Sequence, residues 1–438
     1  MARFLIAALL AVALLAGAAA CSDEEENGPI RFLVSGDPEE LAAYREVIDA
    51  YKEENPDAEV TLVEASDGDD LITRLSTSTA GGSPPDLFLI NYRSYGQFAA
   101  RDAIESIDDR LGDSDAFAAE DFYPEALDAF RWQDEQLCLP QNVSSLVVYY
   151  NRDLFRRYQV AEPRAGWTWD DFVRTASLLT RDANGQIVQA GEPEAGTMPA
   201  AVHGLGVEPA LIRVAPFVWS NGGELVDDDE QPTRFTLDTP AAKQALQSFL
   251  ELRTVQGVTP SDEEVESEDL EARFANGRLA MLLQSRRVTP TFRTSEDFDW
   301  DVAPLPAHRT PASILHSDAF CMTSGSEHKD AAWRFVEFAL GTKGQEILAR
   351  TGRTVPSLKS VATSDAFLDP AQKPKNSQVF LDVIPTIRHV PSISTWPEIE
   401  DVSEGILENG FYLGTPVDDV VRELDVKTRP LFARGESP

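Results

Sequence analysis

The first ninety residues alternate between short apolar runs and amphipathic stretches, and this alternation restricts the fold more than any other feature of the chain. Residues 29–37, 58–65 and 84–92 predict strands, because each is a short apolar run bounded by turn-forming residues. Residues 37–57 and 69–82 carry apolar side chains at helical spacing and predict the intervening helices. Strand, helix, strand, helix, strand is typical of an α/β fold, in which helices cover a parallel sheet.

Polar residues stand at the carboxyl ends of the first and third of these strands. Ser35 and Asp37 follow the first strand, and Asn91 and Tyr92 follow the third. Ligands of open α/β sheets bind beyond the carboxyl ends of the strands, so these positions are candidates for a binding site. A helix cap or a turn is an equally good explanation for Asn91.

The rest of the chain predicts a second domain. Its 438 residues exceed what one hydrophobic core usually serves. Thr168 is the expected N-cap of one later helix, and another helix is expected from Pro240 to about Gln256. The acid-rich residues 261–271 are expected to form a solvated surface loop.

Residues 1–20 have the layout of a secretory signal peptide. Arg3 supplies a basic end, an apolar run follows, and small residues precede Cys21. The run is shorter than the about 20 apolar residues that cross a bilayer. A cysteine at this place resembles a bacterial lipoprotein signal, in which Cys21 is acylated and residues 21–28 form an acidic tether. Ala18 stands where leucine is usual, and ordinary secretion with an incidental cysteine is the alternative.

The charge balance excludes several classes of partner. The net charge of −36 opposes binding to nucleic acid or to anionic lipid surfaces. In an exported chain, Cys138 and Cys321 meet oxidising conditions in which a disulfide persists. Their distance in the sequence leaves open whether they pair.

Catalytic and metal-binding motifs are absent from the sequence. There is no nucleophile elbow, zinc-protease helix, phosphate-binding loop or paired-cysteine motif. The 5 histidines are scattered and show no metal-ligand spacing. We therefore expect no metal, no cofactor and no enzymatic activity.

Several segments, taken in order, resemble the extracellular solute-binding protein family 1, the sugar-binding lipoproteins of ABC importers related to maltose-binding protein. The segments that carry the resemblance are GGSPPDLFLIN, LCLPQNVSSLVVYYNRDLF, GWTWDDFVRTASLLT, WSNGGELV, FANGRLAMLLQSRR, HKDAAWRFVEFALGTKGQEILARTGRTVPS and STWPEIEDV. They extend over most of residues 30–410 in the family's order.

The resemblance implies a two-lobed, periplasmic-binding-protein-like fold (type II). Each lobe is expected to be a mainly parallel sheet covered by helices, with the ligand cleft at the hinge. The N-terminal lobe would comprise residues 29–140 plus 317–366, and the C-terminal lobe residues 141–316 plus 367–438. The chain would cross between them near 140–144, near 316–320 and around Ala366. Cys138 and Cys321 would flank the first two crossings, which favours a disulfide.

The same resemblance implies a set of cleft residues. They are Ser35, Asp37, Asn91 and Tyr92 from the first lobe, Gln141, Asn142, His316 and Asp318 at the crossings, and Phe217, Trp219, Arg286, Arg287 and Trp396 from the second lobe. Carboxylate, amide and guanidinium groups suit sugar hydroxyls, and aromatic rings suit sugar C–H faces. Core packing is the alternative for the tryptophans, and capping or turn formation for Gln141 and Asn142.

Arg286 and Arg287 depart from the maltose-type pattern, which has a stacking tryptophan at this place. Arginine stacks through its planar guanidinium or holds an anionic group. The pair therefore leaves room for a uronate or a polyol phosphate as the ligand. A surface salt bridge is the alternative reading of the two residues.

The functional expectation is a monomeric lipoprotein on the outer face of the bacterial cytoplasmic membrane that captures a carbohydrate and delivers it to an ABC permease. Two other classes remain. A secreted enzyme acting on glycans would use Asp37 and Asp318 as a carboxylate pair. A sensor or adhesion module would bind the sugar without a permease.

Overall fold

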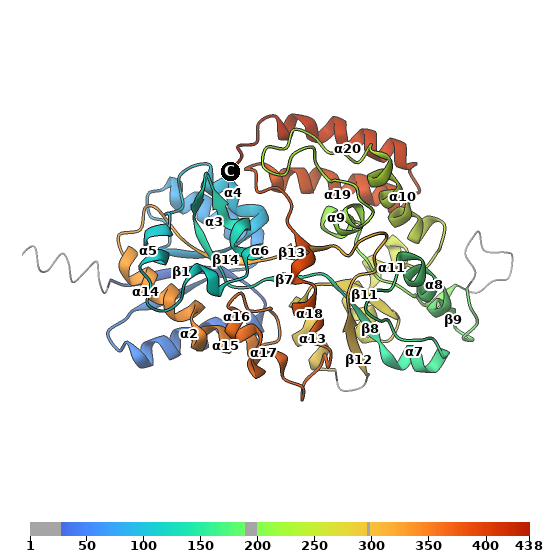
Figure 1. Cartoon of the computed structure of the whole chain (residues 1–438), viewed down its shortest axis with the longest axis horizontal. Helices are drawn as coiled ribbons and strands as arrows, with labels where there is room; N and C mark the ends of the chain where they lie inside the picture. Colours follow the sequence, from blue (N-terminus) through green and yellow to red (C-terminus); the bar gives the residue numbers. More distant parts are fainter. Residues whose placement is uncertain (1–27, 189–198, 296–297) are drawn as a thin grey trace, which may run out of the picture.

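The computed structural model describes residues 28–188, 199–295 and 298–438. They form two lobes side by side, with strands β7 (Ser144–Ser145) and β13 (Ser313–His316) between them (Figure 1). The expected signal peptide (1–20), the lipidation site Cys21 and the tether up to residue 27 lie outside the described residues. No helix within the described ranges is long and apolar enough to cross a membrane.

The first lobe is built on a mixed sheet of five strands. These are, in chain order, β1 (Ile30–Ser35), β2 (Val60–Ala65), β3 (Leu87–Asn91), β6 (Cys138–Pro140) and β14 (Asp318–Met322). Their spatial order is β2-β1-β3-β14-β6, with β1 parallel to β2 and β3 and with β14 antiparallel to both of its neighbours. A disulfide joins Cys138 of β6 to Cys321 of β14, which are directly opposite in the sheet.

Local chemistry explains the helices of this lobe. In α2 (Pro38–Glu54), Asp37 caps the first turn, Pro38 occupies the first helical position, and the helix ends at Asn55. The other helices of this half of the molecule are α3 (Gly68–Ala80), α4 (Tyr92–Ala99), α5 (Asp108–Gly112), α6 (Pro124–Leu127), α14 (Lys329–Leu340) and α15 (Thr342–Arg350). The alternation expected from the first ninety residues is therefore confirmed, with element ends shifted by a few residues.

The second lobe differs from the expected mainly parallel sheet. Its three strands β8 (Val147–Asn151), β11 (Met281–Gln284) and β12 (Trp300–Ala303) pair antiparallel in the order β11-β8-β12. Among the described residues, parallel pairing here consists of two isolated bridges, one from Gly206 to Leu282 of β11 and one from His203 to Leu279, two residues before β11. Both neighbours of β8 come from much later in the chain and run in the opposite direction, so the local alternation of strand and helix that predicts parallel pairing does not apply to this sheet.

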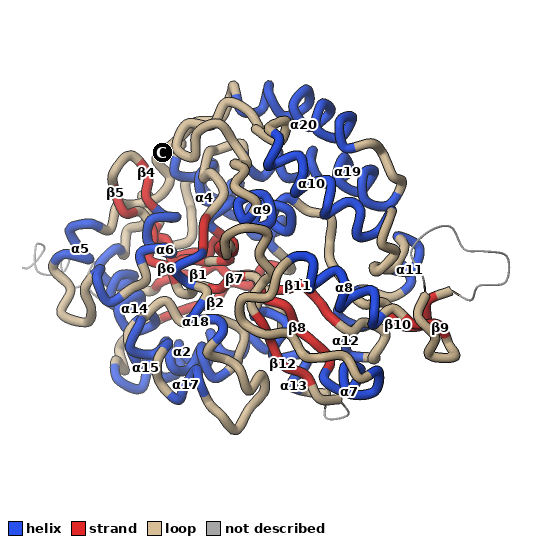
Figure 2. The backbone as a smooth tube through the Cα atoms, turned by 45° about the vertical axis from the view of Figure 1, so that its right-hand side comes forward, coloured by secondary structure: helices blue, strands red, loops and turns tan. Residues whose placement is uncertain are grey.

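Helices surround the strands of both lobes (Figure 2). Those of the second lobe are α7 (Arg152–Tyr158), α8 (Trp169–Leu179), α9 (Leu211–Ser220), α10 (Pro240–Thr254), α11 (Asp262–Ser267), α12 (Leu270–Ala275), α13 (Thr289–Arg293), α19 (Trp396–Tyr412) and α20 (Val417–Phe432). Thr168 caps α8 as expected. The shorter remaining elements are β4 (Arg131–Trp132), β5 (Glu135–Gln136), β9 (Arg181–Asp182), β10 (Ala200–Val202), β15 (Ile387–Arg388), α16 (Lys359–Ala362), α17 (Asp365–Leu368) and α18 (Val379–Asp382).

The acid-rich stretch 261–271 is helical where a loop was expected. Ser261 and Glu264 form a capping box that starts α11, and Asp269 caps α12. Serine followed three residues later by glutamate is a signal for the start of a helix. The prediction of a loop rested on the high charge of the segment and did not take this signal into account.

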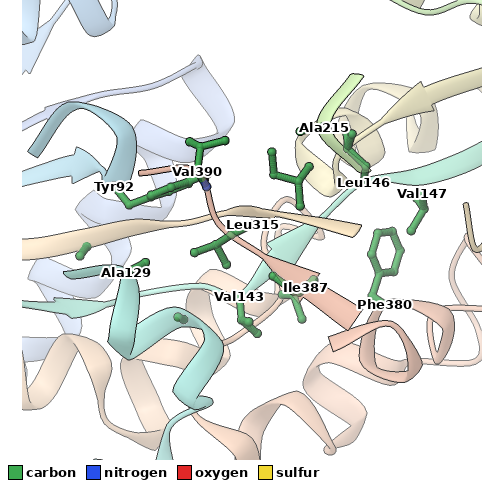
Figure 3. Close-up of a cluster of buried hydrophobic side chains, with 14 of the residues drawn as sticks. Tyr92, Ala129, Val143, Leu146, Val147, Ala215, Leu315, Phe380, Ile387 and Val390 are labelled. Carbon is green, nitrogen blue, oxygen red and sulfur yellow. Dashed lines mark hydrogen bonds between the residues drawn. The ribbon is translucent and has the colours of Figure 1, made fainter. Parts of the chain in front are cut away.

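The hinge has its own apolar core. β13 pairs antiparallel with β7 and parallel with β15, so these three strands lie against one another. Val143, Leu146, Leu315 and Ile387 of this region are buried together (Figure 3). Such packing holds the crossings in register and leaves the cleft above them to polar residues.

Candidate binding cleft

A cavity of about 710 Å³ lies where the two lobes meet. One wall is formed by the carboxyl ends of β1, β2 and β3 and by the helix starts that follow them. The opposite wall is formed by the start of α9 and the end of β11, and the crossing segments close the floor. The cavity is therefore built from both lobes and from the hinge.

Helices α2, α3 and α4 all begin at this cavity with capped N-termini. Asp37 accepts a hydrogen bond from the Glu40 N–H (3.0 Å), and Asp67 accepts one from the Asp70 N–H (2.8 Å). Asn91 accepts one from the Arg93 N–H (3.2 Å). The caps explain why polar residues follow these strands, and all three capping residues line the cavity.

Arg353 connects the first wall with the second. Its Nε is 2.7 Å from a carboxylate oxygen of Glu40, and its Nη1 forms an ion pair with Asp37. The same Nη1 donates to the backbone carbonyl of Arg287 (3.4 Å) in the second lobe. One guanidinium thus balances two carboxylates and links the lobes.

Glu40 titrates far from its ordinary range. Burial raises the pKa of Glu40 to about 7, and the nearby Arg353 opposes this rise. The Tyr44 hydroxyl donates to the Glu40 carboxylate (3.0 Å), and the Gln141 side-chain amide donates to Tyr44 (2.9 Å). Gln141 is therefore placed behind the cleft, where it supports Glu40 through Tyr44.

Asp318 and His316 lie on the floor of the cavity. The Asn91 amide donates to Asp318 (3.0 Å), and the Asp318 backbone N–H donates to Asn142 (2.9 Å). Burial raises the pKa of Asp318. Burial lowers the pKa of His316 well below its ordinary value, and Arg213 lowers it further. His316 is therefore neutral at neutral pH.

The second wall is cationic. The Arg213 Nη2 donates to Glu208 (2.7 Å) and to Gln284 (3.1 Å), whereas its Nε and Nη1 are buried without a hydrogen-bond partner among the described residues. Arg287 forms an ion pair with Glu271. Burial lowers the pKa of Arg213, but a guanidinium remains charged in proteins at neutral pH.

Charge is distributed unevenly over the cavity. The acids that line it belong to the first-lobe sheet and its helices and are Asp37, Glu40, Asp67, Asp69 and Asp318. The second lobe contributes Ile212, Arg213, Gln284, Ser285 and Arg287. Among the described residues that line the cavity there is no phenylalanine, tyrosine or tryptophan. Such a cavity binds through hydrogen bonds and charge.

Part of the expected set of cleft residues lines this cavity. These residues are Ser35, Asp37, Asn91, Asn142, Arg287, His316 and Asp318. They come from strand ends and crossings, where the topology directs side chains to the lobe interface.

The other expected residues do not line the cavity. Tyr92 packs edge-on to His389, and Gln141 lies in the layer behind Glu40. The remaining expected residues are all buried, namely Phe217, Trp219, Arg286 and Trp396. Phe217 packs on Trp169, and the guanidinium of Arg388 lies over the ring of Trp219. Arg286 packs on the rings of Phe367 and Phe380, and Trp396 packs on Phe235 and Phe432. Core packing, the alternative stated for the tryptophans, accounts for both of them.

Sequence reasoning missed several residues that line the cavity, namely Glu40, Ser66, Asp67, Asp69, Arg213, Gln284, Ser285 and Arg353. Ser66 and Asp67 follow the second strand, so the same strand-end argument used for Asp37 applies to them. Arg213 carried no such signal, because it lies inside a helix whose direction depends on the fold of the second lobe.

Comparison with known proteins decides the family. The chain matches the family described as bacterial extracellular solute-binding protein over residues 35–346. It belongs to this family. The solute-binding protein is 24% identical over 420 residues to a binding protein of Brucella abortus (strain 2308), covering 93% of this chain and 94% of the relative.

Solved structures share the fold of this solute-binding protein. An ABC substrate-binding protein from Listeria monocytogenes in complex with cycloalternan has a TM-score of 0.81 at 23% identity, covering 92% of this chain and 99% of that chain. UgpB from Mycobacterium tuberculosis in complex with glycerophosphocholine has a TM-score of 0.78 at 20% identity, covering 93% and 99%. These likenesses confirm the expected two-lobed α/β fold.

Proposed function

We propose that this solute-binding protein captures a carbohydrate in the cleft between its lobes and delivers it to the permease of an ABC importer. The observation that carries the proposal is the polar cavity of about 710 Å³, whose carboxylate, amide and guanidinium groups come from both lobes. Sugar hydroxyls donate to carboxylates and accept from guanidinium and amide groups, so they satisfy both walls at once. The Listeria protein supports this reading, because its fold is shared and it was solved with a cyclic saccharide.

Lobe closure would couple binding to delivery. Arg93 of α4 is 2.7 Å from Glu400 of α19, and Arg353 reaches the Arg287 carbonyl. Both contacts join first-lobe or crossing residues to the second lobe, and a hinge opening would break them. A ligand that touches both walls stabilises the closed state by its differential affinity, and the permease would recognise that state.

Export and attachment complete the proposal. Residues 1–20 would be removed as a signal peptide, and Cys21 would carry the lipid that holds a monomer at the outer face of the bacterial cytoplasmic membrane. The tether 21–28 would keep the acidic body away from anionic lipid. Mass spectrometry of the mature N-terminus would detect the acylated Cys21, and an unmodified N-terminus would contradict this part.

Thermal unfolding of the purified protein tests the carbohydrate assignment. The panel comprises neutral oligosaccharides, uronates, polyol phosphates, peptides and amino acids. A ligand at 100 times its dissociation constant should add about 2.7 kcal/mol to the free energy of unfolding. Asp318→Asn should abolish the response, whereas Arg174→Gln, which changes an exposed ion pair outside the cavity, should retain it.

Two outcomes would contradict the proposal. A response to a peptide alone would remove the carbohydrate assignment and leave the family intact. Conversion of a glycoside into product, lost in Asp37→Asn, would favour the glycan-acting enzyme instead.

A further inference from the structure

Arg213 is almost fully removed from water and only partly hydrogen-bonded. Arg213 is 3% exposed and lines the cavity. Only Nη2 has partners, Glu208 and Gln284, whereas Nε and Nη1 have none among the described residues. Buried N–H donors are nearly always paired in folded proteins. The nitrogens of Arg286 are also unpaired, but that guanidinium packs on the rings of Phe367 and Phe380 and does not line the cavity. The two unpaired donors of Arg213, which does line the cavity, therefore indicate an acceptor that a ligand supplies.

The start of α9 gives a second, independent indication. Ala210 at its N-cap position provides no side-chain hydrogen bond, and the first turn contains no acidic residue. Ile212 and Arg213 of this turn line the cavity. The Arg213 N–H donates to the Ala210 carbonyl (2.9 Å), so the N–H groups of Leu211 and Ile212 are the ones that no side chain caps. The start of this 10-residue helix therefore places two uncapped N–H groups and a partial positive charge next to Arg213.

We infer that the ligand carries an anionic group, a carboxylate or a phosphate, which binds at Arg213 and the N-terminus of α9. Its hydroxylated body then faces Asp37, Asp67 and Asp318 of the first lobe. The inference rests on the proposed function and names the class of carbohydrate that the cleft selects.

The charges of the other cleft residues support this orientation. Arg353 is engaged by Asp37 and Glu40, Arg93 by Glu400, and Arg287 by Glu271. Arg213 is also paired with an acid, Glu208, but through Nη2 alone, which leaves its Nε and Nη1 without a partner among the described residues. Turning the ligand round would place its anionic group among carboxylates. The second wall, in contrast, has no acid among the described residues that line it.

Matched ligand pairs test the inference by titration calorimetry on the purified protein. D-glucuronate is compared with D-glucose, glucose 6-phosphate with glucose, and sn-glycerol 3-phosphate with glycerol. At least one acid should bind about tenfold or more tightly than its neutral counterpart, because a charge-assisted hydrogen bond is stronger than a neutral one. The first pair reports a carboxylate ligand, and the other two report a phosphate.

The variants assign the effect to Arg213. In Arg213→Gln the ratio of acid to neutral affinity should fall to within about threefold of one, whereas Arg174→Gln should keep the wild-type ratio. If Arg213→Gln does not fold, the wild-type ratio decides, and Arg213→Lys tests whether charge alone restores acid binding.

The outcomes separate this inference from the proposed function. Neutral sugars that bind as tightly as their acids, or an acid preference that survives in Arg213→Gln, would overturn the inference and leave carbohydrate capture standing. Failure of every carbohydrate, acidic or neutral, to bind would overturn the proposed function and the inference with it.

Discussion

The helices that line the two walls of the cleft begin in opposite ways. On the first wall, α2, α3 and α4 start with side-chain caps from Asp37, Asp67 and Asn91. On the second wall, α9 starts at Ala210 without a cap. The first wall has thus satisfied its helix ends with the chain's own oxygens, whereas the second leaves donors free. The N–H groups of a capped end are already satisfied by the chain, whereas an uncapped end leaves N–H donors that a ligand can satisfy.

The lobes behind the walls differ as well. The first rests on five strands cross-linked by the Cys138–Cys321 disulfide. The second rests on three strands, and the described part of it contains no cysteine. We therefore expect the first wall to be the more rigid support, and three experiments test this contrast.

Removal of the disulfide should have the largest effect. The double change Cys138→Ala and Cys321→Ala frees two strands that are paired in the sheet but separated by 183 residues in the chain. The free energy of unfolding of the first lobe should fall by about 2–5 kcal/mol. Denaturant unfolding followed by hydrogen exchange measures this, and an equal loss of protection in the second lobe would contradict the contrast between the lobes.

Glu40 should make the first wall sensitive to pH. Its folded-state pKa of about 7 exceeds its ordinary value of 4.5, so the folded state holds this proton more tightly than the unfolded state. Its contribution to stability is therefore fully present below pH 4.5 and is lost as the pH rises through 7. In Glu40→Gln, the free energy of unfolding relative to wild type should rise by about 1–3 kcal/mol between pH 5 and pH 8.

Chemical denaturation at both pH values gives this difference directly. Asp330→Asn serves as the matched control, because Asp330 forms an exposed ion pair with Arg110 away from the cleft. A constant difference between Glu40→Gln and wild type would show that Glu40 ionises normally.

Exchange of the caps should have the smallest effect on stability. Asp67→Ala removes the cap of α3 and should cost about 1 kcal/mol, whereas Ala210→Asp supplies a cap to α9 and should add a similar amount. Ala210→Asp should also weaken the binding of acidic ligands relative to neutral ones, because the new carboxylate would accept hydrogen bonds from the uncapped N–H groups of α9. Paired unfolding and binding measurements test both halves, and a gain in acid binding would contradict them.

Much of the first wall was predictable from the sequence. Strand ends and helix caps are set by residues close together in the chain, so Asp37 and Asn91 could be placed at the cleft before the fold was known. The same argument extends to Asp67. The family resemblance added the crossings and the two lobes, which no local pattern contains.

The neighbours Arg286 and Arg287 show where that reasoning stops. Arg286 lies fully buried between the rings of Phe367 and Phe380, whereas Arg287 lines the cavity and is paired with Glu271. The two rings come from α17 and α18, about 80 to 95 residues further along the chain. Nothing local distinguishes the two arginines.

The sequence by itself determined the α/β elements, the acidic strand ends and the family, because these depend on local periodicity, on caps and on motif order. Only the tertiary structure decided which aromatic residues fill the core, which arginine faces the cleft, and that Arg213 lies at the start of α9 with unpaired donors. The physical reason is that burial of a side chain depends on segments that are distant in the chain and meet it only in the folded protein.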